Sequence, residues 1–125
     1  MSTQPVRVVL VEDNDTFRQT LELLFGMRNE IDVVASIETA DKAPPIVADL
    51  KPDVVLMDYR MPGLNGAEAT RAMLEACPGT SVVCLTASVS AQEIAEVLEA
   101  GAFACVTKDE DFDRLVAAIQ EAAVA

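Results

Sequence analysis

The chain contains no histidine and no tryptophan among its 125 residues. The absence of histidine excludes Ser-His-Asp and Cys-His catalysis, most zinc sites and any histidine pH switch. Positive charge is also scarce, because nine lysines and arginines stand against 21 acids and give a net charge of −12. Nucleic acid and anionic membranes would repel such a surface. We therefore expect no direct nucleic-acid or membrane binding by this domain.

Cysteine and long apolar segments are also scarce. The three cysteines (Cys77, Cys84 and Cys105) are odd in number, show no CxxC spacing and lie in or beside apolar runs. This pattern is typical of reduced thiols in a protein core. The apolar stretch near the N-terminus is too short for a signal peptide, and no run approaches the ~20 apolar residues of a membrane span. These features predict a soluble, cytoplasmic protein.

Apolar residues make up 51% of the chain, which is enough for one folded domain of this length. We find no internal repeat or linker, so residues 1–125 are expected to form a single domain with no second domain in this chain. Short β-branched apolar runs, typical of strands buried on both faces, occur five times. They are Val6–Val11, Asp32–Ala35, Asp53–Met57, Ser81–Leu85 and Phe103–Val106.

Stretches with helical spacing separate these runs. Apolar residues from Phe17 onward predict a first helix whose polar end is Arg28. Pro44-Pro45 cannot lie in a helix interior, so the second helix is expected to begin near Ala43 and to be short. Capping residues predict where the later helices begin, and they are Asn65, Ser90 and Asp111. The β-α alternation predicts an α/β fold. It is a doubly wound, flavodoxin-like, five-stranded parallel sheet of order 2-1-3-4-5 with helices on both faces.

Polar side chains follow four of the predicted strands directly or after one residue. Glu12 and Asp13 follow the first strand, Asp58 the third, Thr86 the fourth and Lys108 the fifth. The carboxyl ends of parallel strands share one edge of the sheet, where open α/β sheets bind ligands. Three carboxylates, a hydroxyl and an ammonium group are therefore expected to converge there.

This group of side chains suggests phosphoryl chemistry. Oxygen ligands without histidine or cysteine suit a hard ion such as Mg²⁺. A metal ion, a lysine and a hydroxyl donor together can hold a phosphoryl group. The chain has no glycine-rich phosphate-binding motif, which argues against a bound nucleotide. Asp58 is the best candidate nucleophile, because its strand is central and the Pro62-Gly63 turn leaves its carboxylate accessible.

The same residues resemble the receiver domain of two-component response regulators. The resemblance covers about Val6 to Ala123 and rests on five motifs in the family's order and spacing. They are Val11-Glu12-Asp13, Val54-Val55-Leu56-Met57-Asp58, Met61-Pro62-Gly63 with Gly66, Leu85-Thr86-Ala87 and Val106-Thr107-Lys108.

The resemblance implies a role for each site residue. Asp58 would accept a phosphoryl group from the phosphohistidine of a histidine kinase, Thr86 would be the switch hydroxyl, and Lys108 would neutralise the phosphate. The implied Mg²⁺ ligands are Asp58, Asp13 directly, Glu12 mainly through water, and the backbone carbonyl of Arg60. The domain would then be a signalling module and not a metabolic enzyme.

Two positions depart from the family's pattern. The family usually has an aromatic residue three positions before the lysine, where this chain has Cys105. Phe103, two residues earlier, would lie on the same strand face. Arg60, two residues after Asp58, would either shield the phosphoryl group or pair with an acidic neighbour.

The resemblance also implies partners beyond the kinase. A homodimer would use the helices predicted at Ser90–Glu99 and Asp111–Ala123, and an output domain, commonly DNA-binding, would lie outside this chain. A phosphatase of the haloacid dehalogenase type would need a second acid where Arg60 stands. A protein-binding module on the same fold that acts independently of phosphorylation remains the alternative, because Cys105 departs from the switch pattern.

Overall fold

Five parallel strands form the central sheet of the computed structural model, which describes residues 4–61, 65–87 and 90–125. The sheet has the order β2-β1-β3-β4-β5, so both the predicted fold class and the strand order are confirmed. The strands are β1 (Val6–Val11), β2 (Ile31–Ile37), β3 (Val54–Asp58), β4 (Ser81–Thr86) and β5 (Ala104–Thr107). Asp58 therefore ends the central strand.

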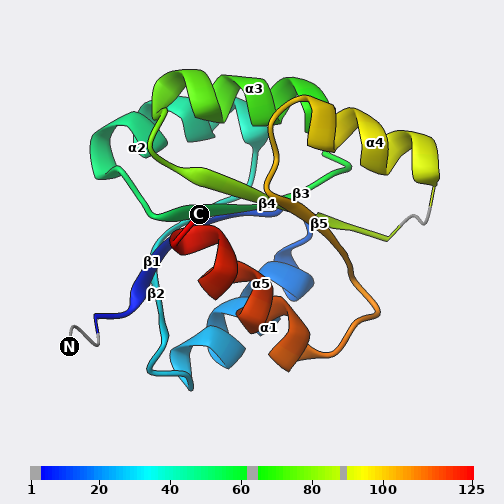
Figure 1. The fold of residues 1–125 in the computed structure, drawn as a ribbon. Coiled ribbons are helices and arrows are strands. Elements are labelled where there is room, and N and C mark those ends of the chain that lie inside the picture. The colour runs from blue at the N-terminus through cyan, green and yellow to red at the C-terminus, as the bar shows by residue number, and fades with distance from the viewer. Residues whose placement is uncertain (1–3, 62–64, 88–89) are drawn as a thin grey trace.

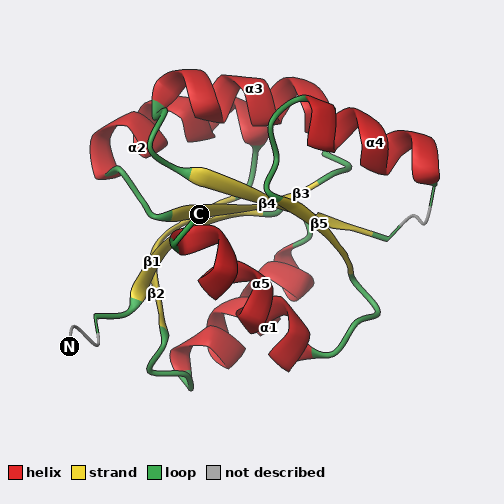
Figure 2. Ribbon diagram, in the orientation of Figure 1, coloured by secondary structure: helices red, strands yellow, loops and turns green. Residues whose placement is uncertain are grey.

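Five helices cover the two faces of this sheet (Figures 1 and 2). They are α1 (Asp15–Gly26), α2 (Ala43–Leu50), α3 (Gly66–Ala76), α4 (Ala91–Glu99) and α5 (Phe112–Ala123). Helices α1 and α5 lie on one face, and α2, α3 and α4 on the other. A short 3-10 turn, Ala40–Lys42, precedes α2. None of the described helices is long and apolar enough to cross a membrane.

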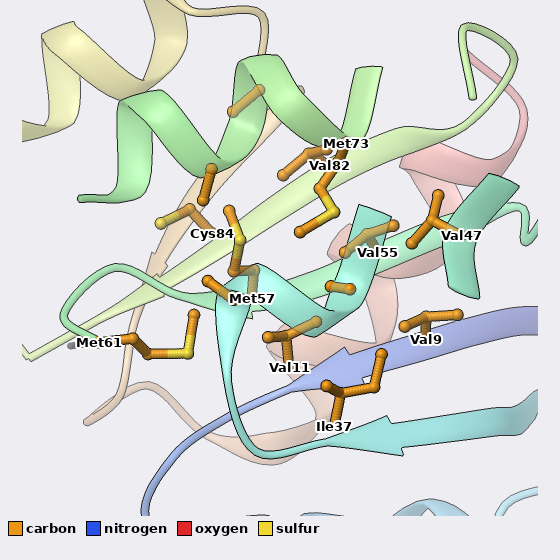
Figure 3. Packing of buried hydrophobic residues seen from close by; sticks show 14 of the residues in the cluster. Val9, Val11, Ile37, Val47, Val55, Met57, Met61, Met73, Val82 and Cys84 are labelled. Atoms are coloured by element: carbon orange, nitrogen blue, oxygen red, sulfur yellow. The ribbon is translucent and has the colours of Figure 1, made fainter. Parts of the chain in front are cut away.

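Successive side chains along each strand point to opposite faces of the sheet, so the core consists of two apolar clusters, one on each face. Val9 and Val11 of β1 face α2, α3 and α4, whereas Val8 and Leu10 face α1 and α5. Figure 3 shows the first cluster, in which Met73 of α3 lies over the sheet near Val55 and Val82. Burial on both faces explains why the central strands are almost purely apolar in sequence. It also leaves the strand ends as the place for polar chemistry.

The predicted helix starts are confirmed by their caps. The side chains of Asn65, Ser90 and Asp111 each accept a hydrogen bond from a backbone N–H three residues later. Helix α2 begins at Ala43 and has eight residues, with proline in its first turn as expected. Local hydrogen bonding, which the sequence does reveal, sets these boundaries.

The predicted end of the first helix is wrong. Helix α1 ends at Gly26, and the backbone N–H of Met27 caps it, so Arg28 lies beyond it. Arg28 instead forms ion pairs with Glu30 at 2.9 Å and with Asp113 of α5 at 2.7 Å. The hydrogen bond from Arg28 lowers the pKa of the Glu30 carboxyl. The side chain thus joins the end of α1 to the start of α5.

Candidate functional site

Strand register aligns the ends of β1, β3, β4 and β5 at one edge of the sheet. Val11 pairs with Met57, so Glu12 and Asp58 follow at equivalent positions. Asp58 pairs with Leu85, and Thr86 pairs with Thr107. The residues that follow these pairs are therefore neighbours, although about 50 positions separate Glu12, Asp58 and Lys108 in the chain.

The three predicted acids come together at this edge. Carboxylate oxygens of Glu12, Asp13 and Asp58 all lie within 4.8 Å of one another. Glu12 is fully buried, Asp58 is nearly so, and Asp13 is exposed to solvent. The backbone N–H of Asn14 donates to Glu12 Oε2 at 3.1 Å, which fixes the orientation of that carboxylate. The cluster is therefore open on the Asp13 side and anchored on the Glu12 side.

Lys108 lies between the two buried acids. Its Nζ is 3.0 Å from Glu12 Oε1 and 3.3 Å from Asp58 Oδ2. The ammonium group also lies 4.5 Å from the centre of the Phe17 ring, a cation–π contact from α1. Burial lowers the pKa of Lys108, but the hydrogen bond to Glu12 and the charge of Asp58 outweigh burial and raise it. Lys108 therefore stays charged at neutral pH.

Electrostatics at the acids favour an added cation. Burial raises the pKa of Glu12, and the hydrogen bond and charge of Asp58 raise it further. Burial, followed by the hydrogen bond and charge of Glu12, raises the pKa of Asp13. One lysine does not fully compensate three carboxylates. Their oxygens form the donor set that Mg²⁺ prefers, so these residues fit a magnesium ion.

Thr86 ends β4 at the same edge and is 2% exposed. Its backbone carbonyl accepts a 2.8 Å hydrogen bond from the N–H of Lys108, which joins the ends of β4 and β5. Because Asp58 pairs with Leu85, Thr86 lies one position beyond the acid on the neighbouring strand. The predicted threonine thus ends its strand at the edge that carries the acids, and the predicted lysine contacts two of them.

The Arg60 side chain pairs with Glu93 and not with the cluster of Glu12, Asp13 and Asp58. Its backbone N–H lies 3.4 Å from Asp58 Oδ1, while its Nη2 contacts both carboxylate oxygens of Glu93 at 3.2 Å. Of the two arrangements that the sequence left open, the structure has the pairing with an acidic neighbour. That neighbour belongs to the first turn of α4, so the pair links the Asp58 loop to this helix.

Tyr59 also lies in this region, and no motif of the sequence points to it. Its ring is partly buried against the first apolar cluster, the one under α2, α3 and α4. A Cβ placed on Gly66 would lie only 2.4 Å from the ring. Burial and then the charge of Glu93 raise the pKa of Tyr59. Glycine at position 66 is consistent with a close approach of another side chain, but the sequence alone does not identify which side chain that is. Pro62 and Gly63, the predicted turn beside Asp58, lie outside the described residues.

Cys105 is not a fully buried core thiol. It lies on the edge strand β5, is partly buried and packs against the apolar cluster under α2, α3 and α4. Phe103 precedes β5 and is 41% exposed. Cys84, directly across from Cys105 on β4, is fully buried as expected. The family usually has an aromatic residue at position 105. In this chain Cys105 stands there, next to Cys84 on the neighbouring strand.

Comparisons with known proteins agree on one family. The model described as the response regulator receiver domain matches residues 8–120. The transcriptional regulatory protein LnrK of Bacillus subtilis (strain 168) is 36% identical over 114 residues, 91% of this chain and 52% of that protein. The regulator DegU of Brevibacillus brevis is 33% identical over 115 residues, 92% of this chain and 49% of that protein. The chain thus spans about half the length of these curated relatives.

Solved structures show the same similarity in three dimensions. The signal receiver domain of the response regulator NarL from Mycobacterium tuberculosis matches with a TM-score of 0.90 at 28% identity and covers 98% of both chains. A two-component response regulator of the LuxR family from Aurantimonas sp. SI85-9A1 matches with a TM-score of 0.89 at 31% identity. That match covers 96% of this chain and 86% of the other.

Proposed function

This chain belongs to the response regulator receiver domain family, and we propose that its Asp58 accepts a phosphoryl group from the phosphohistidine of a histidine kinase. The observation that carries the proposal is the cluster at the sheet edge. Three carboxylates lie within 4.8 Å of one another, and an ammonium group lies 3.3 Å from the one at the end of the central strand. We further propose that the 125 residues form a single receiver domain that works as a signalling module.

The transfer is a displacement at phosphorus. An Asp58 carboxylate oxygen forms a bond to phosphorus, the bond between phosphorus and the imidazole nitrogen breaks, and the imidazole leaves with that electron pair and takes up a proton. Lys108, already beside Asp58, neutralises negative charge on the phosphoryl oxygens. The Thr86 hydroxyl donates a hydrogen bond to one of these oxygens. The burial of Asp58 excludes bulk water from the inner side of the new acyl phosphate.

Glu12, Asp13 and Asp58 are the side chains that would hold Mg²⁺, with the backbone carbonyl of Arg60 as a further ligand. When bound, the ion supplies positive charge to the phosphoryl oxygens and lowers the repulsion that they meet among three acids. Glu12 contributes as an anchored, buried acid, and Asp13 contributes from the exposed side.

Phosphorylation would act on the surface formed by α4, β5 and α5. The arrival of the phosphoryl group recruits Thr86 and Lys108, which end β4 and follow β5, and so shifts the population of this surface. The exposed Leu98 and Phe103 make it a candidate homodimer surface. Because the curated relatives are transcriptional regulators about twice as long, the proposed output is DNA binding by a region outside these 125 residues.

The test is the intact mass of the protein after incubation with acetyl phosphate and Mg²⁺. We expect one phosphoryl adduct per chain, and we expect none in the Asp58→Asn variant or in the presence of EDTA. An adduct that persists in Asp58→Asn would place the acceptor elsewhere. If wild-type protein gives no adduct, the stable beryllofluoride complex is measured next. Failure to bind beryllofluoride with Mg²⁺ would favour a binding module that acts independently of phosphorylation.

A further inference from the structure

Two cysteines face each other across the last two strands of the sheet. Cys84 on β4 pairs in register with Cys105 on β5, so both side chains lie on the same face, toward α3 and α4. Cys84 is fully buried, whereas Cys105 is partly open to solvent. Nothing in the proposed phosphoryl chemistry uses either thiol.

We propose that Cys84 and Cys105 form a redox-active dithiol that a hydroperoxide oxidises to an intramolecular disulfide, with Cys105 as the thiol attacked first. The inference does not depend on the proposed phosphoryl acceptance, because the product is read at the two sulfur atoms whether or not Asp58 is a phosphoryl acceptor.

The separation of the two strands suits the bond. Paired residues on adjacent strands have Cα atoms about 4.8 Å apart, and disulfides span Cα separations of roughly 4.4–6.8 Å. Cys84 and Cys105 are direct register partners on the same face of the sheet, so their side chains are neighbours. Strand β5 is an edge strand of four residues with β4 as its one strand neighbour, so it can adjust toward β4.

Exposure and charge distinguish the two thiols. Cys105 is reached from solvent, while Cys84 is sealed beneath α3 and α4. The hydrogen bond from Cys84 lowers the pKa of Cys105, and that same contact, together with burial, raises the pKa of Cys84. The thiolate is the nucleophile in these reactions. Cys105 is therefore the first thiol to react, and Cys84 is the resolving thiol.

The chemistry balances in two steps. The Cys105 thiolate sulfur attacks one peroxide oxygen, the O–O bond breaks, and the leaving oxygen takes up a proton to give water or an alcohol. Cys105 is now a sulfenic acid. The Cys84 sulfur then attacks the Cys105 sulfur, the S–O bond breaks, and the hydroxyl leaves as water with the Cys84 proton. The two thiols lose two electrons, and these reduce the peroxide.

The test treats the reduced, folded chain with hydrogen peroxide, removes the peroxide with catalase and alkylates the remaining thiols in denaturant. Before alkylation we expect a mass lower than that of the reduced chain by about 2 Da, for the two lost hydrogens. After alkylation we expect one alkylated cysteine, Cys77. Peptide mapping should find Cys84 joined to Cys105. Cys77→Ser is the matched control and should form the same bond, whereas Cys105→Ser should form none.

Three results would overturn the proposal. They are three alkylated thiols after peroxide treatment, a bond that includes Cys77, or Cys105 oxidised beyond the sulfenic acid while Cys84 stays free. Because Cys84 lies in the core and its variants can fold poorly, the second measurement uses wild-type protein alone. The bond should form at least tenfold faster in the native protein than in 8 M urea, and equal rates would show that the sheet does not bring the thiols together.

Discussion

Lys108 supplies the positive charge that lets two buried carboxylates approach each other at the edge of the sheet. It contacts Glu12 at 3.0 Å and Asp58 at 3.3 Å, and its side chain is only 23% exposed. A divalent cation held by the same acids would compete with Lys108 for their oxygens. The lysine therefore favours phosphoryl binding but opposes metal binding.

Replacing Lys108 separates these two effects. In Lys108→Ala we expect Mg²⁺ to bind about tenfold more tightly, a gain of about 1.4 kcal/mol, because the three acids lose their competing cation. Phosphoryl acceptance from acetyl phosphate should nevertheless fall at least tenfold. Calorimetric Mg²⁺ titration and intact mass measure the two quantities. Lys42→Ala removes an exposed lysine on another part of the surface and should change neither. Unchanged Mg²⁺ affinity in Lys108→Ala would contradict this account.

The two acids with raised pKa predict how the stability of the metal-free protein depends on pH. The pKa values of Glu12 and Asp13 are raised from 4.5 and 3.8. Between these ordinary values and the raised values of the folded state, the folded state binds more protons than the unfolded state, so stability falls as pH rises through that interval. We expect the urea midpoint to rise as pH is lowered from neutrality toward these ordinary values.

A variant and a control isolate the acid cluster from the other acids. Asp13→Asn should raise the midpoint at pH 7 and flatten its pH dependence, because it removes one of the repelling charges. The exposed Asp49→Asn, on α2, should leave the slope unchanged. Equal slopes for wild type and Asp13→Asn would show that the cluster does not control this dependence.

Most of the candidate site was predictable from sequence, because each residue follows a strand and strand ends are visible in the apolar runs. Glu12, Asp58 and Thr86 needed only the rule that parallel strands end at one edge. The partner of Arg60 was not predictable. Glu93 lies on a helix 33 positions away, and periodicity does not tell which loop side chain meets which helix.

At the scale of elements, the start of α3 depends on a close contact between a ring and a helix. A Cβ added to Gly66 would lie 2.4 Å from Cδ2 of the Tyr59 ring, which is too close for van der Waals contact. We expect Gly66→Ala to lower the free energy of unfolding by about 1–3 kcal/mol, the usual cost of overpacking, although alanine is the better helix former. Chemical denaturation measures the change.

A double-mutant cycle tests whether this contact is the cause. In Tyr59→Ala the ring is gone, so adding Gly66→Ala should cost at least about 1 kcal/mol less than it does in wild type. Equal costs in both backgrounds would mean that the helix start, and not Tyr59, requires glycine at this position. The Gly79→Ala variant, where a Cβ meets nothing within 4 Å, is the matched control.

Element boundaries were predictable where local bonds set them. The caps Asn65, Ser90 and Asp111 could be identified from single residues, and each begins a helix. The apolar spacing of α1 continued to Arg28, yet the helix ends at Gly26, where the Met27 N–H turns back to the last carbonyls of the helix. Arg28, beyond this end, pairs with Asp113 near the other end of the chain. Long-range ion pairs of this kind leave no periodic signal.

At the scale of the whole molecule, charge and exposed apolar groups oppose each other on the α4 side. The chain carries a net charge of −12, so two copies repel at low ionic strength. Leu98 and Phe103 nevertheless expose apolar surface there, beside the acids Glu96 and Glu99. A homodimer through this face, as proposed, would therefore form more readily when the local negative charge is reduced.

Reversing one charge on α4 tests that surface. We expect Glu96→Lys to strengthen self-association several-fold at low salt, as measured by sedimentation of the beryllofluoride complex, and to leave the phosphoryl adduct unchanged. The difference in self-association between Glu96→Lys and wild type should shrink in about 0.5 M salt, because the Debye length falls below about 5 Å. Asp49→Lys makes the same change in net charge on α2, so an equal effect there would mean that net charge alone drives association. A loss of the phosphoryl adduct in Glu96→Lys would mean instead that α4 belongs to the acceptor site and not to the signalling face.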